Sequence, residues 1–472
     1  MSIDLNRVAV AVAGLLLVVT AVATGSSASQ AAVGDDVRLN EIQVVGSHNS
    51  YKVLPTEAEQ DLIRSVIGDG ADLMQYEHAP LPEQFSDQRV RQIELDVWVD
   101  EAGGLYSQPL LRTATGQGPY RPELMDQPGI KTFHIQDVDY GSTCPTFVLC
   151  LQQVKAWSDA NAGHVPLAIL VELKDTPLVV GSFEFTDPEP WTAAGLDSLD
   201  AEIRSVFSDE DLITPDDVRG GASTLREAVT TTGWPTLGQS RGKVMFLMDN
   251  GGGMRTSYLA GHPSLAGRVL FTNAPPAADD AAFVKRNDPF DPSIPGLVAD
   301  GFVVRTRADS DTEQARSNDT TMRDAALASG AQWVSTDYPV PGLAVGFTTE
   351  YWVGIPGGTV ARCNPVNAPA SCVDAELDQV GAPAPQPQPP APSVPPFSPD
   401  PTGSTPSTGP ATTEPGAGST TQPPPGGPST TEPSPTGPPT TSPSERPPTR
   451  PTRPAPRPPA AAPVRAEPSY TG

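Results

Sequence analysis

Six residues able to carry acid–base or metal chemistry stand at the ends of short apolar runs. The segment VVGSHN ends in His48 and Asn49, and later runs end in Glu-x-Asp, in His and in Glu. A polar cluster after a buried strand is either a solvated turn or the rim of an active site. Its repetition favours an active site, with candidate residues His48, Asn49, Glu94, Asp96, His134 and Glu172.

The carboxylates indicate a metal ion. Glu94 and Asp96 are two residues apart, so in a strand both side chains lie on one face, and the same holds for Glu172 and Lys174. Two carboxylates on an inward face require a cation or a proton, because desolvated like charges repel strongly. With Asn49 they form an all-oxygen ligand set, which suits Ca²⁺ or Mg²⁺ and disfavours zinc or copper.

The two histidines of this set could act as a base and an acid. His48 and His134 are expected on neighbouring strands, where they would flank a reacting phosphorus. A lone histidine is more often structural, so the argument depends on all six groups falling at strand ends together. The other histidines, His78, His164 and His262, lie in loops or before a strand, and we expect them to be structural or solvated.

Strand-like and helix-like segments alternate between residues 33 and 380. Helical spacing is clear in 146–161, 198–207 and 311–330, the last of which stops at Gly330. Eight buried strands alternating with helices predict an α/β fold, a (β/α)8 TIM-type barrel, whose chemistry lies at the carboxyl ends of the strands. The expected strands are 41–49, 92–100, 131–137, 166–175, 243–250, 268–274, 301–309 and 331–339.

Composition divides the 472 residues into three parts. Residues 1–31, with Arg7 before the run VAVAVAGLLLVVTAVAT, have the character of a signal peptide, and a retained anchor is the alternative. Residues 32–380 are expected to form the barrel domain. Residues 381–472 are rich in Pro, Thr and Ser with few large apolar residues, which predicts a disordered tail.

The net charge limits the possible partners. Five Arg and five acidic residues balance within 381–472, so the net charge of −26 belongs to the part before the tail. A chain this acidic is a poor binder of nucleic acid or of an anionic membrane by bulk electrostatics. The acidity either serves solubility alone or accompanies a bound divalent cation.

The four cysteines form two close pairs. Cys144 and Cys150 lie in CPTFVLC, and Cys363 and Cys372 lie in CNPVNAPASC. In an oxidising compartment, local pairs of this kind predict two short-loop disulfides, the first near the site. Metal binding is the alternative, although the spacing matches no zinc site and no histidine lies close to either pair.

The blocks GSHNSY, ELDVW, FHIQDVD, VELKD, RTRAD and STDYP, in this order, resemble a known family. It is the calcium-dependent phosphoinositide-specific phospholipase C family in its secreted bacterial form, a member of the glycerophosphodiesterase-like barrels. The similarity covers about residues 40–340. The resemblance implies a secreted enzyme that cleaves phosphatidylinositol to diacylglycerol and an inositol (cyclic) phosphate, with Ca²⁺ in preference to Mg²⁺.

The resemblance also assigns roles residue by residue. It implies that His134 is the acid toward the leaving oxygen and that His48 stabilises the phosphorane, with a ligand carboxylate as a candidate base. Pleckstrin-like, EF-hand and C2 modules are not expected here, which places polyphosphoinositide preference in doubt. The implied sets are His48 and His134 for catalysis, Asn49, Glu94, Asp96 and Glu172 for calcium, and Lys174 and Arg305 for substrate.

Two other functions remain open. A glycerophosphodiester phosphodiesterase shares the barrel, the Glu-x-Asp pair and a similar last strand, but that family usually begins its site with His-Arg-Gly, whereas this chain has His48, Asn49 and Ser50. A non-catalytic secreted binding protein is the second alternative, supported by the tail, which resembles a cell-wall spacer. For the phospholipase we expect an extracellular or wall-associated monomer that contacts a membrane surface transiently.

Overall fold

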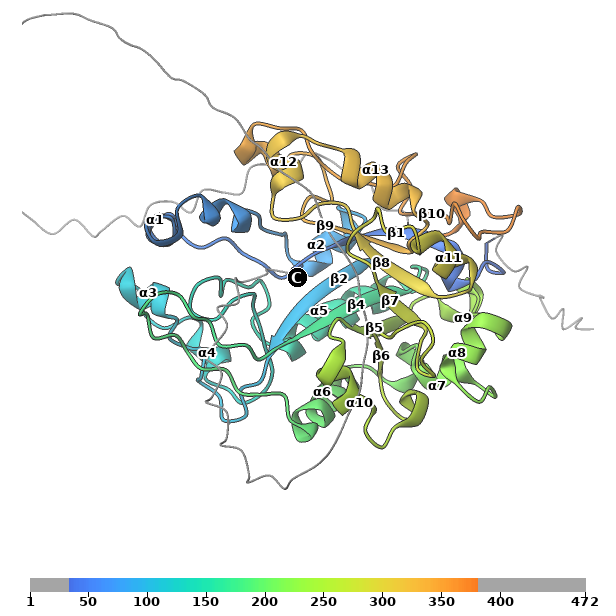
Figure 1. The fold of residues 1–472 in the computed structure, drawn as a ribbon, viewed down its shortest axis with the longest axis horizontal. Coiled ribbons are helices and arrows are strands. Elements are labelled where there is room, and N and C mark those ends of the chain that lie inside the picture. The colour runs from blue at the N-terminus through green and yellow to red at the C-terminus, as the bar shows by residue number, and fades with distance from the viewer. Residues whose placement is uncertain (1–33, 381–472) are drawn as a thin grey trace, which may run out of the picture. The chain divides into compact units, whose positions relative to one another are not determined.

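The structure, a computed structural model, describes residues 34–380 (Figure 1). The predicted signal peptide, residues 1–31, and the predicted tail, residues 381–472, lie outside the described residues. Within the described range, no helix has both the length and the apolar character needed to cross a membrane.

Parallel strands form a nearly closed barrel, which confirms the predicted fold class. Their order is β6-β5-β4-β2-β1-β9-β8-β7, and a parallel bridge between Asn273 and Phe283 joins β6 to β7. Helices surround these strands in Figure 1, as in a (β/α)8 barrel. The barrel strands are β1 Ile42–Ser47, β2 Gln92–Trp98, β4 Leu167–Lys174, β5 Val244–Met248, β6 Leu270–Thr272, β7 Phe283–Lys285, β8 Val303–Arg307 and β9 Trp333–Thr336.

The prediction of a barrel strand over residues 131–137 is wrong. Only Lys131–Thr132 form a strand, β3, which pairs antiparallel with the end of β2. The apolar pattern there reflects packing at the barrel mouth, where the Phe133 ring stacks on Trp98 with centroids 5.3 Å apart. The eighth barrel strand is instead β7, which was missed because its three residues are too few to show a pattern.

The helices lie in the connections between strands. The predictions at 146–161 and 198–207 are confirmed by α5 Phe147–Ala160 and α6 Ala193–Val206. In 311–330, Asn318 adopts a left-handed φ of 54° and separates two short helices. The other helices and one further strand are α1 Glu57–Ile67, α2 Leu81–Ser86, α3 Leu110–Ala114, α4 Pro122–Met125, α7 Pro215–Arg219, α8 Leu225–Glu227, α9 Leu237–Ser240, α10 Gly252–Leu259, α11 Ile294–Ala299, α12 Glu313–Ser317, α13 Thr321–Ala328 and β10 Ala361–Cys363.

The core explains how polar groups reach the barrel interior. Every residue of β2 is buried, and apolar Leu95 and Val97 alternate with Glu94 and Asp96. Because successive side chains point to opposite faces, one face packs against the outer helices while the other carries the carboxylates. Register pairs Asp96 with Glu172 on the adjacent strand β4, so two acidic residues from different strands stand side by side.

Both predicted disulfides are present. Cys144–Cys150 joins the segment after β3 to helix α5, and Cys363–Cys372 joins β10 to the segment that follows it. Their sequence separations of 6 and 9 residues close short loops. Short loops of this kind constrain the unfolded chain by about 2–3 kcal/mol each.

His164 should make stability depend on pH. Its Nδ1 donates to the Val165 carbonyl at 2.6 Å, and burial lowers its pKa from 6.5 to about 4. In the unfolded chain His164 therefore binds a proton near pH 6.5, whereas in the folded chain it binds one only near pH 4. The free energy of unfolding therefore falls as the pH drops from about 6.5 to about 4. This contribution amounts to ~3 kcal/mol.

Urea unfolding of the wild type and of His164→Asn between pH 7 and pH 4 measures this effect. The stability advantage of the wild type should shrink as the pH falls, since other titrating groups are common to both proteins. An advantage that stays constant with pH would contradict the role given to His164.

Candidate active site

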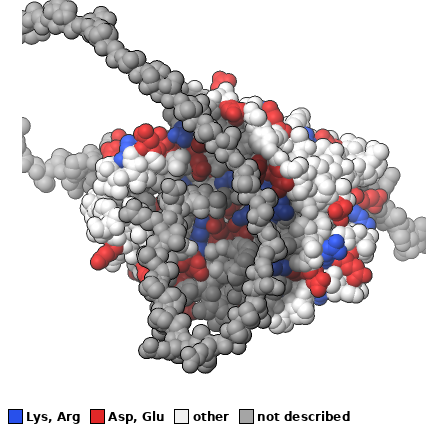
Figure 2. All heavy atoms as spheres, viewed as in Figure 1, with Lys and Arg blue, Asp and Glu red and all other residues white. Residues whose placement is uncertain are grey.

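Three carboxylates from two strands meet at the carboxyl-terminal mouth of the barrel. Glu94 and Asp96 of β2 and Glu172 of β4 each offer an oxygen, and these oxygens lie within 4.8 Å of one another. Glu94 and Asp96 are fully buried and Glu172 is nearly so. Figure 2 shows acidic and basic side chains gathered together in the middle of this face. The sequence prediction that these carboxylates converge is therefore met.

Several oxygens of this cluster lack a hydrogen-bond partner. Glu94 Oε1, Asp96 Oδ1 and Glu172 Oε2 are buried without one among the described residues, and Asp96 Oδ2 has only the Lys174 ammonium at 3.2 Å. Burial raises the pKa of Asp96 well above its ordinary value, and it raises the pKa of Glu94 to about 7 although Arg305 acts to lower it. A hard divalent cation would satisfy these oxygens, so the donor set fits Ca²⁺.

Asn49 stands beside the cluster at the end of β1. Its backbone has a left-handed φ of 46°, its Nδ2 donates to the Tyr76 hydroxyl at 2.8 Å, and its Oδ1 accepts from Tyr51 at 3.2 Å. The next residue, Ser50, donates its amide to the Glu94 carbonyl, and its Oγ accepts from the Glu94 amide. The turn after β1 is thus fixed against β2, next to the first carboxylate.

His48 is held between a carboxylate and a guanidinium. Its Nδ1 lies 2.8 Å from Asp337, and its Nε2 lies 3.1 Å from Arg307. Because a guanidinium can only donate, Nε2 accepts and Nδ1 carries the proton that Asp337 receives. Burial, followed by the charge of Arg307, lowers the pKa of His48 well below its ordinary value. Glu94 Oε1 is 3.9 Å away, so His48 borders the carboxylates.

His134 reaches the site from a loop. The prediction that it ends a barrel strand is wrong, because β3 stops at Thr132 and the chain then turns back. His134 Nδ1 donates to Asp139 at 2.8 Å, and Lys52 lies 3.4 Å from the same carboxylate. Burial alone would raise the pKa of Asp139, but Lys52 and His134 hold it below its ordinary value. The charge of His134 is among those that lower the pKa of His48, after burial and the charges of Arg307 and Arg305.

The two predicted substrate cations contact the carboxylates instead of open solvent. Lys174 Nζ lies 3.2 Å from Asp96 and 2.9 Å from Glu172. The Arg305 guanidinium is fully buried and lies 2.5 Å from Glu94. Binding of substrate by either side chain stays a prediction.

Sequence reasoning missed the partners that orient the histidines. Asp337 and Arg307 both belong to segments that were recognised, STDYP and RTRAD, but no role was given to them. Arg307 follows Arg305 by two residues, which places both on the inward face of β8. Asp139 lies five residues after His134 in FHIQDVD, where only the histidine was noted. Of the other histidines, His78 donates to the His48 carbonyl at 2.7 Å and is structural as expected.

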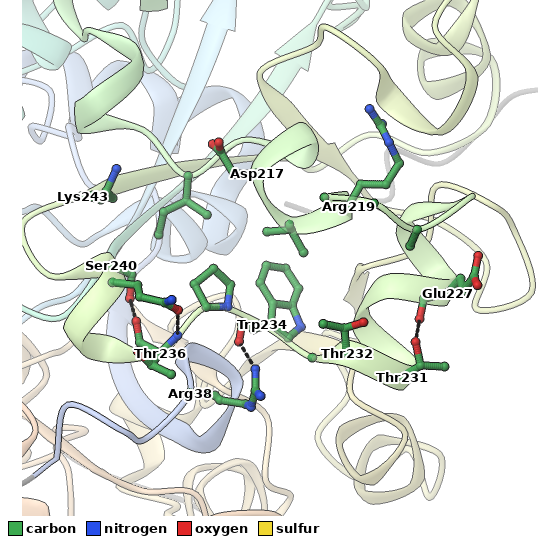
Figure 3. Close-up of a pocket in the computed structure, with 18 of the residues that line it drawn as sticks. Arg38, Asp217, Arg219, Glu227, Thr231, Thr232, Trp234, Thr236, Ser240 and Lys243 are labelled. Atoms are coloured by element: carbon green, nitrogen blue, oxygen red, sulfur yellow. Dashed lines mark hydrogen bonds between the residues drawn. The ribbon is translucent and has the colours of Figure 1, made fainter.

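A cleft at the opposite end of the barrel is separate from this chemistry. It has a volume of about 790 Å³ and is lined by Arg38, Thr236 and Lys243, among others (Figure 3). Arg38 precedes β1 and Lys243 precedes β5, so the cleft lies at the amino-terminal ends of the strands. The candidate active site lies at the carboxyl ends of the strands, where active sites of such barrels are usually found.

Comparison with known protein families found a match over most of the chain. The model described as phosphoinositide phospholipase C, Ca²⁺-dependent, matches residues 37–365, about 70 % of the chain. The chain belongs to this family. It is therefore an enzyme of the phosphatidylinositol-specific phospholipase C class, a phosphoric diester hydrolase, as the resemblance of its sequence blocks implied. A search of curated protein sequences found no match.

Solved structures of phospholipases C also align with the chain. A calcium-dependent phosphoinositol-specific phospholipase C from Pseudomonas sp. is 17 % identical, with a TM-score of 0.41, and the alignment covers 64 % of this chain and 91 % of that one. A Ca²⁺-dependent phosphatidylinositol-specific phospholipase C from Streptomyces antibioticus is 18 % identical, with a TM-score of 0.40, and covers 66 % and 98 %. The phosphatidylinositol-specific phospholipase C of Listeria monocytogenes is 13 % identical, with a TM-score of 0.34, and covers 64 % and 89 %.

Replacing Arg305 should destabilise this phospholipase C. Arg305→Met leaves the buried Glu94 carboxylate without its closest cation, and breaking a buried ion pair in this way costs about 3–5 kcal/mol. Urea unfolding at pH 7 measures the loss. The double variant Arg305→Met with Glu94→Gln should recover part of it, because the uncompensated charge is then gone. A single variant as stable as the wild type would contradict the structural role of this pair.

Proposed function

We propose that the protein is a secreted, Ca²⁺-dependent phosphodiesterase that cleaves phosphatidylinositol to diacylglycerol and an inositol (cyclic) phosphate. The observation that carries the proposal is the meeting of three buried carboxylates, with unsatisfied oxygens, next to His48, whose imidazole is oriented by Asp337. The phospholipases C from Pseudomonas sp. and Streptomyces antibioticus are described as calcium-dependent and as specific for phosphoinositol and phosphatidylinositol, respectively.

The oxygen ligands define how the metal would be held. Glu94, Asp96 and Glu172 would bind Ca²⁺ through the oxygens that lack partners, and Asn49 would add its amide oxygen from the end of β1. Bound there, Ca²⁺ supplies charge that offsets the phosphoryl oxygens and lowers the pKa of the attacking hydroxyl.

The side chains divide the proton transfers between them. The inositol 2-hydroxyl gives its proton to a nearby carboxylate as its oxygen bonds to phosphorus, and the bond from phosphorus to the glycerol oxygen breaks. His134, as the imidazolium, donates the proton on Nε2 to that leaving oxygen and keeps its Nδ1–H on Asp139, so it ends as the neutral ring. His48 would stabilise the phosphoryl group from Nε2 once that nitrogen carries a proton in place of the bond it accepts from Arg307, with Nδ1–H held by Asp337.

The family match favours this reaction over the alternatives. A glycerophosphodiester phosphodiesterase would accept the same barrel, but the match is to the phosphoinositide phospholipase C family over residues 37–365. A non-catalytic binding protein would have no need for two imidazoles that each donate Nδ1–H to a buried carboxylate. Orientation of this kind fixes the tautomer that proton transfer requires.

Exposed apolar side chains support contact with a lipid surface. Val179 and Phe183, in the connection after β4, are 82 % and 53 % exposed, and Phe290, after β7, is 57 % exposed. All three follow the carboxyl ends of barrel strands, on the same face as the candidate site. Apolar groups there would enter the membrane while the phosphodiester reaches the carboxylates. Such contact would be transient and made by a monomer.

The disulfides support an extracellular site of action. Both bonds join cysteines near in sequence, and such bonds persist in oxidising compartments. A secreted or wall-associated enzyme would meet phosphatidylinositol at a membrane exposed to the exterior.

Turnover of phosphatidylinositol with Ca²⁺ and with EDTA tests the proposed reaction. We expect a phosphorylated inositol product with Ca²⁺ and a loss of activity with EDTA, and little turnover of glycerophosphocholine.

His134→Ala should lower kcat by ~10²–10⁴-fold and leave Ca²⁺ binding intact, because His134 moves a proton and holds no metal. Asp96→Asn should weaken Ca²⁺ binding and turnover together. Activity that is indifferent to EDTA would overturn the metal mechanism.

The exposed apolar side chains should matter only at an interface. Val179→Ser with Phe183→Ser should lower turnover of phosphatidylinositol vesicles about tenfold, because two apolar groups no longer enter the bilayer. Turnover of a monomeric short-chain substrate should stay unchanged. A matched control is Val366→Ser with Val373→Ser, which alters two exposed valines at the opposite end of the barrel. Equal losses on vesicles from both pairs would contradict the proposed docking face.

A further inference from the structure

Lys174 occupies a special position in the carboxylate cluster. It is the last residue of β4, two residues after Glu172, so both side chains lie on the inward face. The register pairs Asp96 with Glu172 and Trp98 with Lys174. Lys174 therefore stands one step closer to the barrel mouth than the two carboxylates that it contacts.

The Lys174 ammonium lies between the carboxylates and solvent. Its Nζ is 3.2 Å from Asp96 Oδ2 and 2.9 Å from Glu172 Oε1. The side chain of Lys174 is 20 % exposed, whereas those of Glu172 and Asp96 are 12 % and 0 % exposed. Of these three side chains, Lys174 is therefore the most exposed to solvent and Asp96 the least.

The two cations of the cluster differ in their freedom to move. Arg305 is fully buried, and besides Glu94 it contacts Ser335 at 3.1 Å and Asn287. Among the described residues, the ion pairs of Lys174 are with Asp96 and Glu172 alone. The Lys174 ammonium, on a flexible stem near solvent, can leave without breaking other polar contacts of its side chain, and the Arg305 guanidinium cannot.

Charge makes simultaneous occupation unfavourable. When all three carboxylates are ionised they carry three negative charges, and Lys174 and Arg305 together supply two positive ones. A divalent cation added beside Lys174 would lie a few ångströms from an ammonium in a partly desolvated site, where like charges repel strongly. Lys174 contacts Asp96 Oδ2 and Glu172 Oε1, so a metal on the remaining oxygens of the same two carboxylates would lie beside the ammonium.

We propose that Lys174 is a tethered competitor of Ca²⁺. Its ammonium stabilises the metal-free cluster by pairing with Asp96 and Glu172, it leaves them when Ca²⁺ binds, and this exchange sets the affinity for Ca²⁺. The inference rests on the proposed function, which makes the cluster a calcium site. Displaced toward the mouth, the ammonium faces the space where the anionic phosphodiester arrives, so metal binding makes a cation available to the substrate.

Calcium binding by Lys174 variants tests the competition. Isothermal titration of Ca²⁺ at pH 8 compares the wild type with Lys174→Met, Lys174→Gln and Lys174→Arg. Removing the ammonium should tighten Ca²⁺ binding about tenfold or more, because the metal no longer displaces a cation. Lys174→Arg keeps the charge and should bind Ca²⁺ much as the wild type does. The Gln variant serves if the Met variant fails to fold.

Thermal unfolding provides a second readout of the same exchange. In EGTA, Lys174→Met should have a lower Tm than the wild type, because Asp96 and Glu172 lose their counter-ion. Saturating Ca²⁺ should remove most of this difference, so the rise in Tm caused by Ca²⁺ is larger in the variant. Lys155→Met is the matched control: it makes the same substitution at an ion pair on α5, with Asp159 2.6 Å away, and should change neither quantity.

Unchanged or weaker Ca²⁺ binding by both Lys174→Met and Lys174→Gln would overturn the proposal, and Lys174 would then be a substrate contact or a structural cation. Turnover of phosphatidylinositol by the wild type, measured alongside, separates the two levels. If the wild type is Ca²⁺-dependent but the variants do not bind Ca²⁺ more tightly, only the competitor role fails. If the wild type binds no Ca²⁺, the proposed metal site and the competitor role fail together.

Discussion

Burial of three carboxylates at one end of a barrel is the constraint on which the rest of the site depends. Glu94, Asp96 and Glu172 cannot all be charged in a partly dry interior without compensation. Arg305 compensates from inside the barrel and Lys174 from its mouth, and several oxygens still lack partners. A divalent cation would satisfy that residual demand for positive charge, and this is the physical reason for the proposed metal site.

The imidazoles are ordered by the same principle of paired charges. Each donates Nδ1–H to a carboxylate, His48 to Asp337 and His134 to Asp139, so each has a defined tautomer. The carboxylate partners are themselves tied to cations, Asp337 to Arg307 and Asp139 to Lys52. A continuous set of ion pairs thus links the histidines to the barrel frame, and little reorganisation is needed when a phosphodiester arrives.

Sequence patterns predicted the parts of this arrangement that are local. The period of two in ELD and ELK placed Glu94 with Asp96 and Glu172 with Lys174 on inward faces, as the register of β2 and β4 bears out. Patterns did not reveal β7, which has only three residues, and they placed His134 on a strand because Phe133 is buried at the mouth. The pairing of His48 with Asp337 joins residues 289 positions apart, a contact that the chain closes only when β1 meets β9.

The central claim is that one divalent cation binds where the carboxylates meet. Crystals grown with Ca²⁺, measured by anomalous X-ray scattering, test it most directly. We expect a single strong anomalous peak at ~2.3–2.6 Å from oxygens of Glu94, Asp96 and Glu172, with the Asn49 amide oxygen as a further ligand. The Lys174 ammonium should be turned away from the peak. A cluster without a peak at saturating Ca²⁺, with the Lys174 ammonium still between Asp96 and Glu172, would contradict it.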